Sequence, residues 1–228
     1  MKLYLALGSP NCRKVQAVVH QLGLSIDTEY LDPSKGEHKA PGFMELNPNG
    51  MVPLLTDGTF QLWESHAIMQ YLCDTAGDTE LFPRDPNARA DIARWQCWEL
   101  AHFGNHLSRA LLERVFKPFA GAGAPDPDES VVGRSLEAFA TFAQILDHRL
   151  EDRSFVCGST VTLADFSLGA QLGLASYGRV DLTPYPNLRR WVARLDEVDA
   201  WAASAMPDAM RAVLEERLAI GEPVATRA

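Results

Sequence analysis

Short apolar runs alternate with stretches of helical spacing over the first 76 residues. This pattern predicts a small mixed sheet with helices packed against it, in the order strand, helix, strand, then strand, strand, helix. The expected strands are 3–7, 28–31, 52–56 and 59–63, and the expected helices are 11–23 and 65–76. The dipeptide Asp57-Gly58 between the last two strands is typical of a hairpin turn. Residues 32–50 are polar and rich in Pro, Gly and Asn, so we expect a long loop with one helical turn.

Strand-like runs end at a polar linker, residues 77–87, and the rest of the chain has helical spacing. Apolar residues there recur every three or four positions, which predicts an all-helical bundle over residues 88–220. The expected helices are 88–117, 130–150, 162–178, 186–198 and 207–219, with a break at 120–128 and a loose tail at 221–228. The predicted fold is therefore an α+β N-terminal domain (1–76) followed by an all-α C-terminal domain.

One helix start in the second half carries a complete capping signal. The Thr162 side chain can accept a hydrogen bond from the backbone of Asp165, whose carboxylate can bond back, forming a capping box. Val161 and Phe166 flank it at the positions of a hydrophobic staple. Because loss of such a cap costs about 1 kcal/mol, we interpret this segment as a folding device and not as a functional site.

Composition narrows the possible functions. The 228 residues are 46% hydrophobic and 22% charged, which is typical of a globular protein with a sizeable core. The net charge of −9 argues against nucleic-acid binding, since that needs clustered Lys and Arg. No apolar run is long enough to cross a bilayer, and Met1-Lys2 leads into the first strand without a secretory signal. The four cysteines have no paired short spacing, so we expect neither disulfides nor a metal site, and a cytoplasmic location.

The stretch SPNC, residues 9–12, joins the first strand to the first helix and holds candidate reactive groups. A helix N-terminus offers unpaired N–H groups and the positive end of the helix dipole, so a thiol there ionises more easily. Cys12 is therefore either a small packed core residue or a thiol that forms mixed disulfides. Ser9 cannot be oxidised, but it can donate a hydrogen bond to a sulfur atom supplied by a ligand, and Asn11 could do the same.

Two further segments of the first half carry candidate binding groups. Glu64 and Ser65 open the helix after the hairpin, where Ser65 can cap it and its backbone N–H can hold a carboxylate. Glu64 can pair with an ammonium group, so the two residues would hold both charged ends of an amino acid; the alternative is a plain N-cap. Pro53 lies at the start of the third expected strand, but spacing alone does not predict a cis bond, which only about 5% of X–Pro bonds adopt.

Four ordered motifs give the chain a resemblance to a known family. They are SPNCRKV (9–15), GEHKAP (36–41), NPNGMVPLL (47–55) and WESHAIMQYL (63–72), and TLADFSLG (162–169) matches the family's usual helical folding motif. Over about residues 1–205 the chain resembles a cytosolic glutathione S-transferase of the serine type, with phi-like, theta-like and delta-like features and a bacterial character. The resemblance implies a thioredoxin-like N-terminal domain that binds glutathione, a helical domain that holds a small hydrophobic electrophile, a detoxifying activity and a homodimer.

The resemblance also assigns roles to individual residues. It implies that Ser9 donates a hydrogen bond to the glutathione sulfur, with Asn11 and Cys12 as the alternatives. Val52, before a cis Pro53, would pair with the cysteinyl backbone of glutathione. Glu64 and Ser65 would hold its γ-glutamyl end.

The glycine end of glutathione is implied to bind near a third segment. His38 and Lys39 would lie near the glycine carboxylate, with Met51 close to them. Met51 stands where phi-like members often have glutamine, and Gly50 stands where delta-like members have histidine, so this chain departs from both patterns.

The second substrate is expected to bind against the first long helix of the helical domain. His102 and His106 lie one turn apart on it, in a stripe with Trp95 and Trp98, and a pair without a third ligand does not predict a metal site. The expected lining residues of the pocket for the electrophile are His102, His106, Phe116, Phe119 and Tyr177. The alternatives to a transferase are a glutathione-dependent disulfide or peroxide reductase that uses Cys12, and a non-catalytic ligand-binding or interaction protein.

Overall fold

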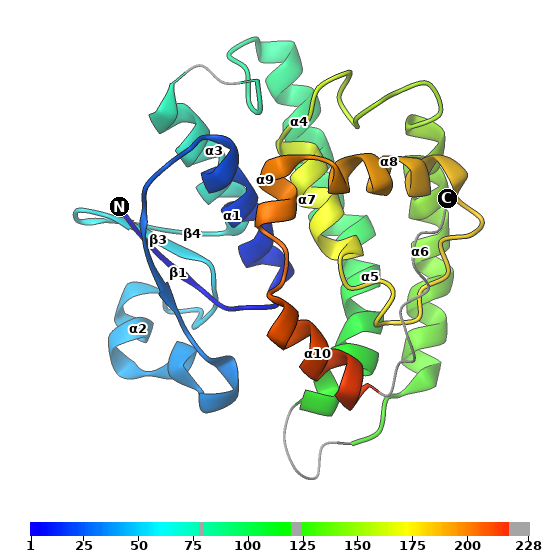
Figure 1. The fold of residues 1–228 in the computed structure, drawn as a ribbon, viewed down its shortest axis with the longest axis horizontal. Helices are drawn as coiled ribbons and strands as arrows, with labels where there is room; N and C mark the ends of the chain where they lie inside the picture. The colour runs from blue at the N-terminus through cyan, green and yellow to red at the C-terminus, as the bar shows by residue number, and fades with distance from the viewer. Residues whose placement is uncertain (78–79, 120–124, 219–228) are drawn as a thin grey trace.

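The computed structural model describes residues 1–77, 80–119 and 125–218, and it has the two-part architecture that the hydrophobic pattern predicts (Figure 1). The N-terminal domain contains a four-stranded mixed sheet in the order β2-β1-β3-β4. Its elements are β1 (Lys2–Leu5), α1 (Pro10–Gln21), β2 (Asp27–Tyr30), β3 (Leu54–Asp57), β4 (Phe60–Trp63) and α3 (Ser65–Ala76). Strand β1 pairs in parallel with β2 and antiparallel with β3, and β3 pairs antiparallel with β4.

Alternating side chains of β1 explain why the sheet is covered on both faces. Leu3 and Leu5 are buried in the large core with α1 and α3, whereas Tyr4 packs against a small cluster around Phe43. This alternation is the two-residue period of a strand. Because α1 and α3 lie between the sheet and the helical half, the start of α1 faces the C-terminal domain (Figure 1).

The segment 32–50 has more helix than the sequence predicts. It forms two short 3₁₀ turns, η1 (Pro33–Lys35) and η2 (Glu37–Lys39), followed by the helix α2 (Pro41–Leu46). Phe43 of α2 is buried against Tyr4 and supplies the cover for the second face of the sheet. One buried aromatic residue in an otherwise polar segment gives too weak a periodicity to predict this helix.

The described part of the C-terminal domain is built from helices, as predicted, apart from one isolated bridge between Phe155 and Gly158. They are α4 (Pro86–Trp98), η3 (Glu99–Phe103), α5 (Gly104–Leu111), η4 (Leu112–Phe116), η5 (Lys117–Phe119), α6 (Glu129–Arg149), α7 (Leu163–Leu172), α8 (Pro186–Asp196), α9 (Asp199–Ala203) and α10 (Asp208–Arg217). None of the helices in the described ranges is long and apolar enough to cross a membrane. Most of the break at 120–128 and the whole tail at 221–228 lie outside the described residues.

Three expected helices differ from the observed ones. The expected helix 88–117 is interrupted by two π-helical turns, η3 and η4. The expected helix 162–178 ends at Leu172, because the apolar residues that follow it, Leu174 and Ala175, are buried in a turn. The expected helix 186–198 ends at Asp196. The short helix α9 begins at Asp199 and places Trp201 in the core.

The predicted capping box at the start of α7 is confirmed. The Asp165 carboxylate accepts hydrogen bonds from the Thr162 backbone N–H and hydroxyl at 2.9 Å. Its other oxygen accepts from the backbone N–H of Val156 at 2.8 Å and from Nε1 of Trp191 at 2.9 Å. Every residue of α7 is buried, so this helix is the centre of the C-terminal domain and Asp165 fixes its start.

Candidate functional site

Ser9 lies at the junction of β1 and α1 and caps the helix. Its side-chain oxygen accepts a hydrogen bond from the backbone N–H of Cys12 at 3.4 Å, and Pro10 occupies the first helical position. A hydroxyl that accepts in this way keeps its own hydrogen available for donation. Ser9 is half-buried, and the positive end of the α1 dipole lies beside it.

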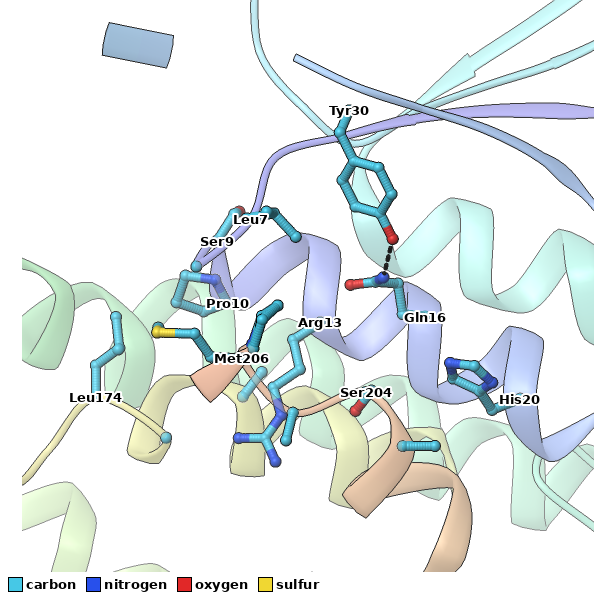
Figure 2. A pocket seen from close by; sticks show the side chains of 16 residues that line it. Leu7, Ser9, Pro10, Arg13, Gln16, His20, Tyr30, Leu174, Ser204 and Met206 are labelled. Atoms are coloured by element: carbon cyan, nitrogen blue, oxygen red, sulfur yellow. Dashed lines mark hydrogen bonds between the residues drawn. The ribbon is translucent and has the colours of Figure 1, made fainter. Parts of the chain in front are cut away.

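A pocket of about 220 Å³ opens beside Ser9, between the two domains (Figure 2). One side consists of the β1–α1 connection, the exposed face of α1 and Tyr30 of β2. The opposite side consists of the end of α7 and the segment 203–207 between α9 and α10. Leu7, Leu174 and Met206 give it an apolar region near Ser9, whereas Arg13, Gln16 and His20 follow α1 away from Ser9 (Figure 2).

Cys12, the alternative reactive residue, faces the protein core. Its side chain is fully buried, and its sulfur accepts a hydrogen bond from the backbone N–H of Ala6 at 3.3 Å. Burial raises the pKa of the Cys12 thiol, which disfavours the thiolate. Cys12 does not line the pocket, and neither does Asn11, which is exposed on the first turn of α1.

The loop before β3 carries the next group of expected binding residues. The Val52–Pro53 peptide bond is cis, as the resemblance implies. Met51 is 66% exposed, and its carbonyl accepts a hydrogen bond from Nδ2 of Asn47 at 2.8 Å, which holds the loop against α2.

Lys39 approaches this loop closely, and its position explains the glycine at 50. Its Nζ donates a hydrogen bond to the carbonyl of Asn49 at 3.2 Å. Gly50 has φ +56°, and a Cβ added there would lie 2.6 Å from Nζ of Lys39. A histidine at position 50 would therefore displace the Lys39 side chain, so Gly50 leaves the space that Lys39 occupies. His38 is half-buried on the same 3₁₀ turn, η2.

Glu64 and Ser65 open α3, but their capping roles differ from the prediction. Glu64, not Ser65, is the N-cap residue, and it makes no side-chain cap hydrogen bond. Glu64 has φ +73°, a conformation that is sparsely populated for residues other than glycine, and its side chain is exposed. Ser65 is buried as the first residue of the helix. A strained, exposed carboxylate next to a helix N-terminus with free N–H groups is a feature of binding sites.

A buried charged cluster lies behind this segment, and sequence reasoning missed it. Nζ of Lys14 in α1 lies 2.9 Å from Nε2 of His66 in α3 and 3.6 Å from Oε2 of Glu99 in η3. All three side chains are buried. Burial lowers the pKa values of Lys14 and His66, whereas the Lys14 charge and His66 outweigh burial and lower the pKa of Glu99. A lysine in the middle of the apolar pattern of α1 was the only available signal.

The residues expected to line the pocket for the electrophile do not line the pocket beside Ser9. His102 and His106 instead stack on Phe142 of α6, with ring centroids 5.0 and 5.3 Å away. The physical reason is the π-helical turn η3, which adds a residue to the turn and rotates the following side chains around the helix axis.

The other expected lining residues also lie elsewhere. Phe116 is 41% exposed, and Tyr177 is half-buried against the main core. The side chain of Phe119 lies outside the described part of the structure. The segment 203–207, which forms the opposite wall, was missed because its small residues carry no chemical signal in the sequence. In residues 1–77, 80–119 and 125–218, no cluster of three or more His, Cys, Asp or Glu side chains could hold a metal ion.

Comparison with known families agrees with this geometry. Residues 3–80 match the family model described as the N-terminal domain of glutathione S-transferase, and residues 105–194 match the model of its C-terminal domain. These ranges contain the sheet with Ser9 and Glu64, and most of the helical bundle.

Individual relatives cover nearly the whole chain. A glutathione S-transferase 2 of Anopheles gambiae is 34% identical over 84% of this chain and 88% of its own length. A probable glutathione S-transferase GSTF2 of Oryza sativa subsp. japonica is also 34% identical, over 84% and 89%. Among solved structures, a delta-class glutathione transferase of Nilaparvata lugens has a TM-score of 0.80 and 29% identity, covering 96% of this chain and 98% of that one. This chain therefore belongs to the glutathione S-transferase family.

Proposed function

We propose that this glutathione transferase binds glutathione along the N-terminal domain and stabilises its thiolate with the hydroxyl of Ser9. The observation that carries the proposal is that Ser9 accepts its capping hydrogen bond and still lines an interdomain pocket. Its hydroxyl can therefore turn its hydrogen toward the sulfur atom of a ligand at the positive end of α1. A solved relative, described as glutathione S-transferase-I bound with lactoylglutathione, is 26% identical with a TM-score of 0.79, covering 90% of this chain and 97% of that one.

The proposed contacts are energetically sufficient for thiolate formation. Lowering a thiol pKa from about 8.5 to about 6.5 requires roughly 2.7 kcal/mol. A hydrogen bond to a charged acceptor supplies about 1.5–3 kcal/mol, and a helix N-terminus adds about 0.3–1 kcal/mol. Ser9 then acts as a hydrogen-bond donor without any general base, and the sulfur of glutathione is the nucleophile.

The other proposed contacts divide between the two domains, with glutathione on the N-terminal domain and the electrophile on the C-terminal domain. We assign glutathione to residues 1–76, with Val52 and Pro53 at the cysteinyl unit and Glu64 and Ser65 at the γ-glutamyl end. His38, Lys39 and Met51 surround the glycine end in this assignment. Residues 88–220, after the linker 77–87, supply the wall for a small hydrophobic electrophile.

The reductase alternative is less well supported than the transferase. It requires Cys12 to form a mixed disulfide with glutathione, and the buried thiol of Cys12 is turned toward Ala6. A non-catalytic binding protein would not need Ser9 and Glu64 at the pocket and helix start together.

Replacing Ser9 tests the proposal. We expect Ser9→Ala to raise the pH midpoint of kcat/KM for conjugation of 1-chloro-2,4-dinitrobenzene by about one pH unit or more, because about 1.5–3 kcal/mol of thiolate stabilisation is lost. The exposed Ser25→Ala is the matched control and should leave the profile unchanged. An unchanged profile in Ser9→Ala would reject the role, and the absence of heat on titration with millimolar glutathione would reject glutathione binding itself.

We also propose a homodimer in the cytoplasm, with the N-terminal domain of each subunit against the C-terminal domain of the other. Large hydrophobic side chains are exposed on both domains: Met51, Phe60, Trp63, Leu100, Leu112 and Phe116. Cys12, Cys97 and Cys157 are free thiols, which suits a reducing compartment. Light scattering should give twice the 25.1 kDa of one chain, and a monomer would contradict the dimer.

A further inference from the structure

Arg13 is a partly buried cation in the wall of the pocket beside Ser9. Its guanidinium group stacks over the ring of Trp201, 3.7 Å from the centroid. On the other side, a Cβ added at Gly173 would lie 2.7 Å from Nη1, so the guanidinium fills the space that this glycine leaves. Figure 2 shows the side chain extending from α1 toward the segment that holds Ser204. Arg13 is therefore held in place by packing.

Among the described residues, Arg13 has no carboxylate as an ion-pair partner, and its close contact is the Trp201 ring. Nε is buried without a hydrogen-bond partner, and no carboxylate oxygen of the described residues lies within 4.0 Å of the guanidinium. Asp196 is the attractive charge nearby, but its carboxylate accepts a hydrogen bond from Nε1 of Trp201 at 3.1 Å. Arg211 of α10 repels Arg13. Burial lowers the pKa of Arg13 to about 10, so the group still carries its charge at neutral pH.

The position of this charge relative to Ser9 determines which shape of ligand fits the pocket. Ser9 and Arg13 are four residues apart at the start of α1, which corresponds to about 6 Å along the helix axis and to the same face. Both line one pocket, whose apolar side chains Leu7, Leu174 and Met206 lie near Ser9. A flat apolar body with a reactive carbon at one end and an anionic group at the other fits this arrangement.

We propose that the pocket selects aromatic electrophiles that carry a carboxylate, with the carboxylate bound by Arg13 and the reactive carbon beside the sulfur at Ser9. This proposal rests on the transferase function proposed above and names the class of its second substrate. An ionised acceptor supplies the anionic partner that the guanidinium lacks, and it relieves the repulsion between Arg13 and Arg211. In a chain with a net charge of −9, such a site attracts an anion that the rest of the surface repels.

The reaction on such a substrate is a substitution. For 4-chloro-3,5-dinitrobenzoate, the glutathione thiolate attacks the ring carbon that bears chlorine and forms a carbon–sulfur bond. The carbon–chlorine bond breaks, chloride leaves with the bonding electron pair, and the thiol proton has already passed to solvent. The carboxylate at the far side of the ring takes no part in these bond changes, so Arg13 is a specificity-determining residue in this proposal.

The test compares this carboxylate with its uncharged amide, 4-chloro-3,5-dinitrobenzamide, on the same enzyme. Each kcat/KM is divided by the uncatalysed rate constant with glutathione, because the two substituents activate the ring differently. We expect the wild-type enzyme to favour the carboxylate, and Arg13→Gln to lower its value about tenfold or more while changing the amide less than about threefold. The exposed Arg84→Gln, which makes the same change in net charge, should leave the preference intact.

A second measurement needs no variant, since Arg13→Gln could fail to fold after losing its packing on Trp201. 3,5-Dinitrobenzoate lacks a leaving group, and we expect it to inhibit conjugation of the amide competitively and more strongly than 3,5-dinitrobenzamide does. Equal inhibition, a wild-type preference for the amide, or equal losses for both substrates in Arg13→Gln would overturn the proposal while leaving the transferase function intact. If neither substrate reacts and glutathione gives no heat of binding, both proposals are wrong.

Discussion

Glu64 combines two properties at one residue, an exposed carboxylate and a backbone with φ +73°. A non-glycine residue in such a conformation costs about 1–3 kcal/mol, and the cost persists where a site requires the geometry. The sequence predicts Glu64 as a binding residue from its place before a helix, but the left-handed backbone depends on how β4 enters α3. Spacing along the chain does not reveal that angle.

Replacing Glu64 by two small residues separates strain from binding. We expect Glu64→Gly and Glu64→Ala both to weaken glutathione binding about tenfold or more, because both remove a charge-assisted contact. We expect the glycine variant to be more stable than the alanine variant by about 1 kcal/mol, since only glycine adopts this backbone without strain. Urea unfolding and calorimetric titration measure the two effects. At an ordinary helical position the order of stability would be reversed, so an alanine variant as stable as the glycine variant would argue against strain.

Among the elements, α7 has the strongest start signal in the sequence. In the structure, the capping residue Asp165 makes more hydrogen bonds than this signal predicts. The capping box predicts the contact between Thr162 and Asp165, but Asp165 also accepts from the Val156 backbone and from the Trp191 indole. These partners are distant in sequence, so a local motif cannot predict them. The carboxylate is fully buried, and burial raises its pKa against the effect of its hydrogen bonds.

We expect Asp165→Asn to destabilise the protein by about 3 kcal/mol or more. The amide group offers one acceptor oxygen where the carboxylate offers two, so buried donors are left unpaired. The matched control is Asp85→Asn at the exposed start of α4, where the side chain accepts from the Ala88 N–H. Asparagine caps a helix about as well as aspartate, so this control should be close to neutral. Equal losses in the two variants would mean that the extra partners of Asp165 contribute little.

The elements themselves were predictable where the hydrophobic period is regular and the connections between elements are short. The succession of strands and helices along the first domain, the hairpin at Asp57-Gly58 and the start of α3 follow the pattern closely. The π-helical turn η3 does not, because it depends on the packing of Glu99, whose carboxylate occupies the space that a side chain at Gly104 would need. This unforeseen turn is the reason that His102 and His106 point toward α6.

At the scale of the whole molecule, one hydrophobic core runs through both domains, and a charged cluster lies inside it. Leu3, Val15 and Ile68 of the first domain belong to the same core as Phe103 and Leu163 of the second. Lys14, His66 and Glu99 join α1, α3 and η3 at the centre of this contact. The pocket beside Ser9 also needs both domains, which explains why its far wall could not be derived from either half of the sequence.

A paired change in the cluster should lower the free energy of unfolding by less than the two single changes added together. We expect Lys14→Met or Glu99→Gln alone to lower the free energy of unfolding by about 3–5 kcal/mol, because each leaves a buried charge without its partner. The double variant Lys14→Met/Glu99→Gln should lose less than the sum of the two single changes, since no uncompensated charge remains. Urea unfolding of the four proteins gives the coupling free energy, and strict additivity would show that the charges do not interact.

The same cluster predicts how stability changes with pH. The pKa of His66 is lowered by burial, so the folded protein keeps this imidazole neutral, while the unfolded chain takes up a proton below about pH 6.5. The unfolded state then binds more protons, and the free energy of unfolding falls as the pH drops through this range. Glu99, whose pKa is also lowered, adds a further loss at more acidic pH. Urea unfolding at pH 8, 6.5 and 5 should show this decline, and His66→Gln, which keeps a polar group beside Lys14 but does not titrate, should flatten it between pH 8 and pH 5. A slope that His66→Gln leaves unchanged would place the titrating group elsewhere in the molecule.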